Sequence, residues 1–308
     1  MRSVVLLSRK YSLLGKKYET AQTTAAIVFL FPTFVALVFL FVLPVVQVVL
    51  ISFTNWNLAT GVKDFVGLKN FNYLFTDDAF GKSIVNTFMY SVFKLSMDLV
   101  LSLLIAVMLD SHIPFKRSLR TIYFAPVVVP IVASSLIWIW FYDPGIGPFN
   151  QILTFMGLPK LQWLYHESTA LLSIGLFSVW KGLGYNIVLF LAGLQNIPES
   201  YMEAAYIDGA SNTQAFFKIK LPLLSPIASF VIMMGIINSF KVFTEINVMT
   251  PGGGPLNSTT LLVVYIYEQA FTNGKMGRGS AAALILFMII FVLTLVQKTV
   301  SHKTVYYD

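Results

Sequence analysis

The strongest constraint on this chain is the length of its charge-free apolar segments. No charged residue occurs between Glu19 and Lys63, and the segment 25–53 inside that window is apolar. It is long enough to cross a bilayer, which takes about 20 residues. Over the whole chain 56% of residues are hydrophobic and 11% are charged, whereas soluble domains carry about 25% charge. The sequence therefore predicts an integral membrane protein that lies in the lipid bilayer.

Six apolar segments of this kind follow one another along the chain. They lie near 25–53, 84–109, 119–141, 169–194, 225–243 and 279–298. Each is expected to be a helix, because lipid offers no hydrogen-bond partner to an open backbone. The expected fold is all-α with six transmembrane helices. A basic tail at 1–22 is expected to precede a transmembrane domain at 23–308, which contains all six. Pro126 and Pro130 are expected to kink the third span. Outside the spans, 251–255 is expected to be irregular and 261–271 a short helix.

The lysines and arginines between the spans indicate an orientation. One side of the membrane would hold Arg2, Arg9, Lys10, Lys16, Lys17, Lys116, Arg117, Arg120, Lys218, Lys220, Lys298 and Lys303, and the other Lys63, Lys69, Lys82, Lys160, Lys275 and Arg278. Because basic loops stay in the cytoplasm, we expect a multi-pass protein of the cell (plasma or inner) membrane with both termini cytoplasmic. The net charge of +7 then reflects orientation, and no nucleic-acid partner is expected.

The segment 196–226 is more patterned than a simple connection requires. A helix is expected to start at Pro198 and to stop at Gly209, because glycine adopts the backbone angles that end a helix. A second helical segment is expected near 213–220, and Pro222 and Pro226 prevent a continuous helix into the fifth span. Small alanines beside Glu203 allow close approach of another surface. The segment is therefore interpreted as a docking element for a separate protein.

A helix that only rests on lipid headgroups is the alternative interpretation of this segment. Such a helix carries a basic polar face. The first helix here carries Glu199, Glu203 and Asp208 instead, which favours docking to a protein.

The same residues resemble the EAA loop of binding-protein-dependent ABC importer permeases. The matching positions that would couple the chain to an ATPase are Glu203, Ala204, Ala205, Asp208, Gly209, Ala210, Leu221 and Pro222. Residues 250–255, 265–267 and 67–71 are similar to the carbohydrate-uptake branch, the relatives of the maltose and glycerol-3-phosphate permeases. The resemblance implies the type I importer permease fold and the import of a carbohydrate, with an oligosaccharide as the first choice.

The resemblance also implies the partners of the chain. These are a second permease subunit, two ATPase subunits and an extracytoplasmic solute-binding protein. Glu203 would pair with a base in a cleft of an ATPase subunit, and ATP-driven closure of the ATPases would move the loop as a lever. ATP and Mg would be bound by those subunits, so no cofactor is expected in this chain, which would be a non-catalytic subunit.

Polar residues within membrane spans are candidates for function. On the fourth and fifth spans the substrate-binding candidates are Trp180, Gly182, Tyr185, Asn186, Asn238, Ser239, Phe240 and Lys241. Aromatic rings would stack on a sugar, and Asn and Ser suit its hydroxyl groups. Alternatively, the aromatics form an interfacial belt and the glycines pack helices.

The charged residues of the spans also have structural alternatives. Lys241 either snorkels to the surface or pairs with Glu245. Lys181 and Lys241 leave open an anionic ligand, such as glycerol-3-phosphate or another anionic sugar derivative. Lys94 and Asp98, four residues apart, are expected to form an ion pair on one helix face.

Other functional classes have weaker sequence support. His112, His166 and His302 lie in separate loops, so no metal site is expected. A secondary transporter driven by an ion gradient usually shows internal repeats, and none is evident here. An intramembrane enzyme is disfavoured because no paired carboxylates or nucleophile motif lie at membrane depth.

Overall fold

The computed structural model describes residues 22–111 and 116–304. Four helices in this part are long and apolar enough to span a membrane. They are Gln22–Ser52, α4 (Asp78–Asp110), α8 (Glu167–Gln195) and the segment Met276–His302 of α15 (Met276–Thr304). These correspond to the first, second, fourth and sixth predicted spans. The predicted tail lies outside the described residues, apart from Gln22.

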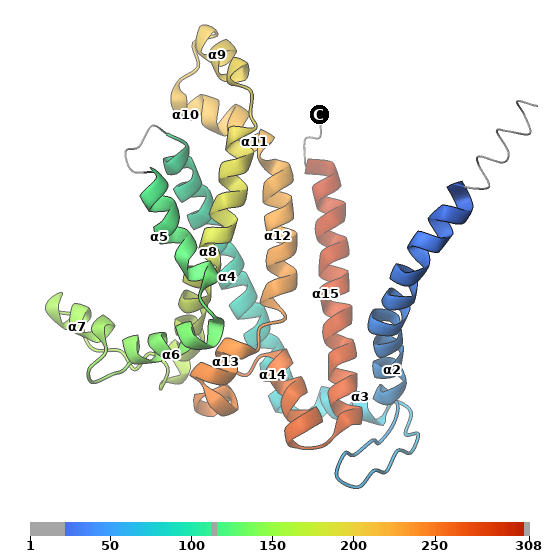
Figure 1. Ribbon diagram of the computed structural model, residues 1–308. Helices are drawn as coiled ribbons and strands as arrows, with labels where there is room; N and C mark the ends of the chain where they lie inside the picture. The colour runs from blue at the N-terminus through green and yellow to red at the C-terminus, as the bar shows by residue number, and fades with distance from the viewer. Residues whose placement is uncertain (1–21, 112–115, 305–308) are drawn as a thin grey trace, which may run out of the picture.

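The third predicted span is a bent pair of helices, and the fifth is a helix that forms a bent pair with the segment before it. α5 (Lys116–Val128) is followed by α6 (Ile131–Phe141), and Thr121–Val128 makes an angle of 110° with α6. The segment Asn212–Leu223 and α12 (Ser225–Ser239) are bent by 59°. Prolines lie at both bends, as the sequence predicted. Figure 1 shows that α6 runs across the end of the bundle instead of continuing the direction of α5.

The bend after α5 follows from the chemistry of Pro130. Proline has no backbone N–H, so the carbonyl of Pro126 loses its helical partner four residues on. The ring also disfavours helical angles at Val129, the preceding residue. Pro130 itself has φ −55° and ψ 136° and stands at the start of α6. The first helix of the third span therefore ends at Val128, and the chain continues in a new direction as α6.

The central helices pack closely in a bundle (Figure 1). α8 lies along α4 and α5, and α12 contacts α4 and α15. A Cβ atom on Gly184 of α8 would lie 2.2 Å from the carbonyl oxygen of Tyr123 in α5, and one on Gly235 of α12 would lie 2.4 Å from Leu95 of α4. Small residues thus bring the helices together, as is common inside membranes.

The first span stands apart from this bundle. It contains a π-helical turn, η1 (Val38–Val42), and continues as α2 (Leu43–Ser52), which contacts α15. Toward its N-terminal end the span leans away from the other helices (Figure 1), and none of its most apolar stretch is buried. Lipid or another chain can cover this surface.

Short elements cover the end of the bundle opposite α9. They are α3 (Lys69–Thr76), α7 (Pro148–Phe155), α13 (Thr244–Met249), the 3₁₀ turns η3 (Pro251–Gly253) and η4 (Pro255–Asn257), α14 (Leu262–Tyr267) and the π-helix η5 (Glu268–Thr272). A β-bridge joins Thr54 and Phe65. The helix expected at 261–271 is confirmed by α14 and η5. The irregular stretch expected at 251–255 consists of short turns with positive φ at its three glycines.

Candidate functional site

The segment 196–226 forms a projecting tip at one end of the bundle (Figure 1). It comprises α9 (Glu199–Ile207), α10 (Asn212–Ala215), the π-helix η2 (Phe216–Lys220) and α11 (Leu221–Leu223). The structure confirms that the first helix follows Pro198 and stops before Gly209.

The end of α9 is fixed by backbone hydrogen bonds around Gly209. Its φ is +81°, in the left-handed region that glycine tolerates. The Gly209 N–H donates to the carbonyl of Tyr206 at 3.1 Å, and the Ala210 N–H donates to that of Ala205 at 2.9 Å. This pair of bonds is the Schellman motif. It turns the chain sharply, so that α10 starts within a few residues of the end of α9.

Two further interactions hold the tip in place. Ser211 and Gln214 form a capping box at the start of α10, which satisfies backbone donors at both positions. The Lys220 ammonium lies 3.1 Å from the Asp110 carboxylate at the end of α4. This ion pair ties the tip to the bundle. It was not predicted, because the two residues are far apart in the sequence.

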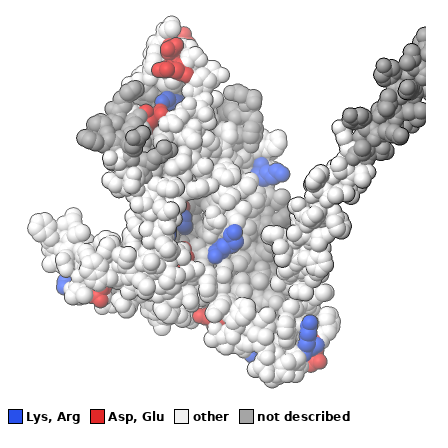
Figure 2. Space-filling view, viewed as in Figure 1, with Lys and Arg blue, Asp and Glu red and all other residues white. Residues whose placement is uncertain are grey.

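The predicted coupling residues differ in exposure. Those exposed are Glu203, Ala204, Asp208 and Gly209, those half-buried are Ala210, Leu221 and Pro222, and Ala205 is buried. Of the two adjacent alanines, only Ala204 therefore lies on the open surface. Figure 2 shows acidic side chains gathered at this tip, over α9. The exposed face of α9 thus combines negative charge with a small residue.

The predicted substrate residues on α8 do not share one surface. The Trp180 ring lies 5.2 Å from that of Trp138 in α6, centroid to centroid, and belongs to an aromatic cluster. Tyr185 is 48% exposed. Five residues of helix separate them, which places them about 140° apart around the axis. Stacking of both rings on one sugar therefore has no support in this structure.

Gly182 and Asn186 are half-buried on α8. A Cβ on Gly182 would lie 3.4 Å from the Lys94 ammonium nitrogen of α4. Lys94 forms the predicted ion pair with Asp98, whose side chain is buried. Gly182 therefore leaves room for this ion pair, whereas Gly184 serves the packing of α8 on α5.

The predicted residues at the end of α12 fall into two groups. Asn238 and Lys241 are exposed. Phe240 is buried, with its ring 5.2 Å from that of Phe88, and the buried Ser239 hydroxyl donates to the carbonyl of Ile236 in its own helix at 3.1 Å. Only Asn238 and Lys241 are open to a ligand in this structure.

The suggested pairing of Lys241 with Glu245 is wrong within the part of the chain that the structure describes. Glu245 is 7% exposed and accepts a hydrogen bond of 3.4 Å from the Ser178 hydroxyl of α8. Ion pairs among the described residues are Lys94–Asp98 and Lys220–Asp110. Glu245 turns inward because α13 packs against α6 and α8, a contact that the sequence does not reveal.

Lys181 has a structural task at the α5–α6 bend. Its ammonium donates to the carbonyls of Pro126, of Val127 at 3.2 Å and of Val129 at 2.7 Å. A cation at the C-terminus of a helix also interacts favourably with its dipole. Lys181 thus supplies donors that Pro130 cannot, and its availability to an anionic ligand is reduced accordingly.

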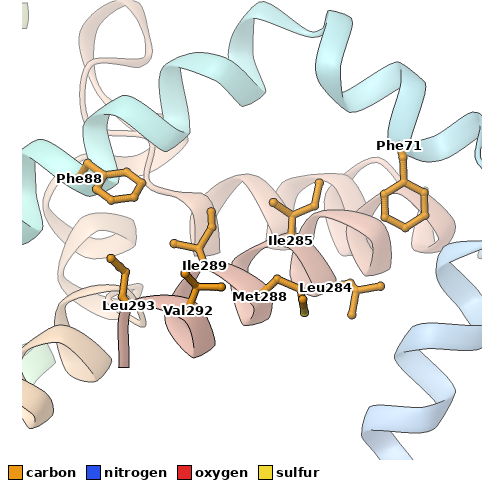
Figure 3. Close-up of a pocket in the computed structure, with 8 residues that line it drawn as sticks. All are labelled: Phe71, Phe88, Leu284, Ile285, Met288, Ile289, Val292 and Leu293. Atoms are coloured by element: carbon orange, nitrogen blue, oxygen red, sulfur yellow. The ribbon is translucent and has the colours of Figure 1, made fainter. Parts of the chain in front are cut away.

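An apolar groove of about 490 Å³ lies beside α15. Its lining side chains come from α15, from Phe71 of α3 and from Phe88 of α4 (Figure 3). Small-molecule sites need a few placed polar groups to fix their ligand, and every lining side chain here is apolar. This groove suits lipid and not a sugar.

Comparison with known proteins gives a consistent picture. Residues 98–306 match the family described as the inner membrane component of binding-protein-dependent transport systems. The chain belongs to this family. Membership confirms the resemblance to binding-protein-dependent permeases and decides against the ion-gradient-driven alternative.

Several permeases of this family are similar over most of their length. The probable ABC transporter permease YurN of Bacillus subtilis is 34% identical over 87% of this chain and 93% of its own. The multiple sugar-binding transport permease MsmF of Streptococcus mutans is 35% identical over 89% and 94%. The sn-glycerol-3-phosphate permease UgpA of Yersinia pestis is 34% identical over 80% and 83%.

The fold is that of an ABC importer permease. A chain of a bacterial transporter that imports the acidic polysaccharide alginate superposes with a TM-score of 0.81, at 20% identity, over 93% of this chain and 98% of that one. The structure of a bacterial alginate transporter in complex with an alginate pentasaccharide-bound periplasmic protein superposes with a TM-score of 0.80, over 93% of this chain and 96% of that one. The expected all-α membrane fold of this permease is thereby confirmed.

Proposed function

We propose that this permease imports a carbohydrate, with an oligosaccharide as the first choice, and that ATP hydrolysis by partner subunits drives the transport. The observation that carries the proposal is the exposed face of α9, with Glu203 and Ala204, inside the segment that matches the family. A negative, closely approachable helix at the end of a membrane bundle suits a basic cleft of an ATPase subunit. The MsmF relative supports the substrate class.

The same proposal fixes the orientation and the partners. The tip of 196–226 and both termini lie in the cytoplasm, and the end with α3, α13 and α14 faces a solute-binding protein outside. A second permease completes the path, and the first span, which leaves its own bundle, offers it an apolar surface. ATP and Mg are held by two ATPase subunits.

Purification of the tagged chain from its native membrane tests this assembly. The expected result is co-purification of a second permease and an ATPase, with sugar uptake in reconstituted vesicles that requires ATP and a binding protein. Uptake that persists without any ATPase subunit contradicts the proposal.

A second candidate substrate is glycerol-3-phosphate or another anionic sugar derivative. The UgpA relative supports it, and Lys241 stands exposed three residues after Asn238 at the end of α12. Competition separates the two candidates. An excess of unlabelled glycerol-3-phosphate is expected to leave oligosaccharide uptake unchanged if the first candidate holds, and Lys241→Met is expected to abolish uptake only of an anionic ligand.

A further inference from the structure

A cleft of about 390 Å³ with apolar walls and a few polar side chains lies between α4, the start of α8 and Ser258 of the 250–260 loop. Lys82 and Glu167 stand at its exposed rim, and Tyr90 and Phe93 line it further along α4. From Lys82 to Phe93 the cleft follows α4 for about 17 Å, at 1.5 Å per residue. It lies along the first half of α4 and the first two turns of α8, toward the end of the bundle opposite α9. Trp180 stands about 13 Å further along α8 than Leu171 in its wall.

Two residues that line this cleft carry buried hydroxyl groups without a standard hydrogen bond in the described part of the chain. The side chains of Tyr90 and Ser258 are 1% and 7% exposed, and both line the cleft. The Ser258 hydroxyl has no hydrogen bond within the described part of the chain, and the Tyr90 hydroxyl, which lies beside that of Ser178, has none of standard geometry. Buried polar atoms are normally satisfied, and each exception needs an explanation. A ligand that brings its own donors and acceptors would satisfy both.

The loop that carries Ser258 is held in a strained conformation. Leu256 and Asn257 have φ of 52° and 58°, in the left-handed region that costs about 1–2 kcal/mol for residues with side chains. Lys82 donates to the carbonyl of Leu256, and Asn86 donates to those of Asn257 at 3.1 Å and Thr260 at 3.2 Å. Strained backbone that neighbours over-determine clusters at ligand-binding sites. Here the strain places Ser258 against the cleft.

The rest of the lining matches the chemistry of a sugar. Aromatic and aliphatic walls with a few placed polar groups are typical of sites for small ligands. The Phe93 ring is set against α8, since a Cβ on Gly175 would lie 2.8 Å from it. Apolar walls suit the carbon face of a pyranose, and hydroxyls with amides suit its edge.

We propose that this cleft is a carbohydrate-binding site, distinct from the Trp180–Tyr185 region, which receives a hydroxyl-rich ligand at the outer mouth of the permease. The assignment rests on the proposed function of sugar import. A phospholipid headgroup at the rim is the competing occupant. The headgroup matches the cleft less well, because at the rim it would leave the buried Tyr90 and Ser258 hydroxyls without a hydrogen bond.

Uptake by the reconstituted complex tests the two hydroxyls. The probes are labelled maltotriose, raffinose and an alginate trisaccharide, presented with the binding protein. Because the Ser258 hydroxyl makes no hydrogen bond within the described part of the chain, Ser258→Ala is expected to leave folding intact. The half-saturating sugar concentration should nevertheless rise roughly five-fold, as for the loss of one hydrogen bond. Tyr90→Phe is expected to act likewise. Ser91→Ala removes another buried hydroxyl that has no hydrogen bond among the described residues and does not line the cleft; it is the matched control, expected to leave that concentration unchanged.

Thiol labelling gives a readout independent of transport. The chain has no cysteine, so Ser258→Cys introduces its only thiol. Sugar is expected to slow modification of this thiol by a small methanethiosulfonate several-fold. The Leu256→Cys thiol, on the same loop but exposed, should react at the same rate with and without sugar. The whole complex is labelled, and the extent of modification is measured from the mass of this chain.

The outcomes separate the site from the function on which it rests. The native complex could transport a probe sugar while Ser258→Ala and Tyr90→Phe leave the half-saturating concentration unchanged and sugar leaves the labelling rate unchanged. That result overturns the site and leaves the import proposal standing. Transport of none of the probes by the native complex overturns both. A Ser258→Cys thiol that does not react at all, or that only phosphatidylethanolamine vesicles protect, also overturns the sugar site.

Discussion

The ammonium of Lys181 lies 2.7 Å from the carbonyl oxygen of Val129, where α5 ends and the chain turns through 110° into α6. A lysine within a membrane span thus completes the hydrogen bonding of a helix that proline interrupts. In lipid, unsatisfied backbone groups are costly. The polar residue that a sequence marks as a ligand contact can therefore serve the fold instead.

Replacing Lys181 is expected to destabilise the bend. Lys181→Met removes charged donors from three carbonyls, and we expect a loss of about 2 kcal/mol, the size of a hydrogen bond to a charged group. Lys241→Met is the matched control, since Lys241 is exposed, and should change stability by less than about 0.5 kcal/mol. Thermal unfolding of the purified complex measures both. Equal midpoints for the two variants would contradict the capping role.

The Lys94–Asp98 pair is expected to show strong coupling. Lys94→Met leaves a buried carboxylate without its partner, which costs about 3–5 kcal/mol, whereas removal of both charges in Lys94→Met with Asp98→Leu should be nearly neutral. A double-mutant cycle on unfolding free energies measures the coupling. Additive effects would show that the two side chains do not stabilise each other.

Glu203 is expected to couple ATP hydrolysis to transport. Glu203→Lys reverses the charge on the exposed face of α9, so uptake should fall while ATP hydrolysis by the assembled complex continues. Glu199→Lys, on the first turn of the same helix, is the matched control with a smaller expected effect. Uptake and phosphate release are measured together in vesicles. Normal uptake by Glu203→Lys would count against the docking assignment.

Gly209 is expected to be needed for the shape of the tip. Its φ of +81° disfavours a β-branched side chain, so Gly209→Val should reduce uptake strongly in a complex that still assembles. Gly209→Asn is the control, because asparagine tolerates this conformation at helix ends, and it should retain most uptake. Equal uptake by both variants would show that the Schellman turn has no part in coupling.

Tyr185 and Trp180 are expected to respond differently to truncation. Tyr185→Ala should weaken the apparent affinity for sugar and leave assembly intact, since its ring is 48% exposed. Trp180→Ala removes a member of the Trp138 cluster and should mainly lower the amount of folded protein. Apparent affinity and yield are compared for the two. An unchanged affinity would remove Tyr185 from the substrate path.

Local sequence patterns predicted those features that depend on few neighbouring residues. Apolar length predicted the spans, Gly209 predicted the end of α9, and four-residue spacing predicted the Lys94–Asp98 pair. Contacts between distant segments were not predictable from one sequence. Glu245 meets Ser178, and Lys220 meets Asp110, only because the helices pack as they do.

The candidate site shows the same division. Exposure of Glu203 on an end of the bundle follows from the pattern of the loop. The burial of Phe240 depends on how the helices pack. The separation of Trp180 from Tyr185 depends on the angle between them around the axis of α8. A list of polar and aromatic residues within spans therefore overestimates the number that a ligand can reach.

The most direct test of the account is a cross-link from the tip of α9. Because the chain lacks cysteine, Ala204→Cys carries its single thiol, to which a photoactivatable group is attached in the assembled complex. The account predicts an adduct with an ATPase subunit, and none from the Leu256→Cys position at the opposite end. An adduct of the Ala204→Cys variant with the extracytoplasmic binding protein, or with lipid alone, would contradict it.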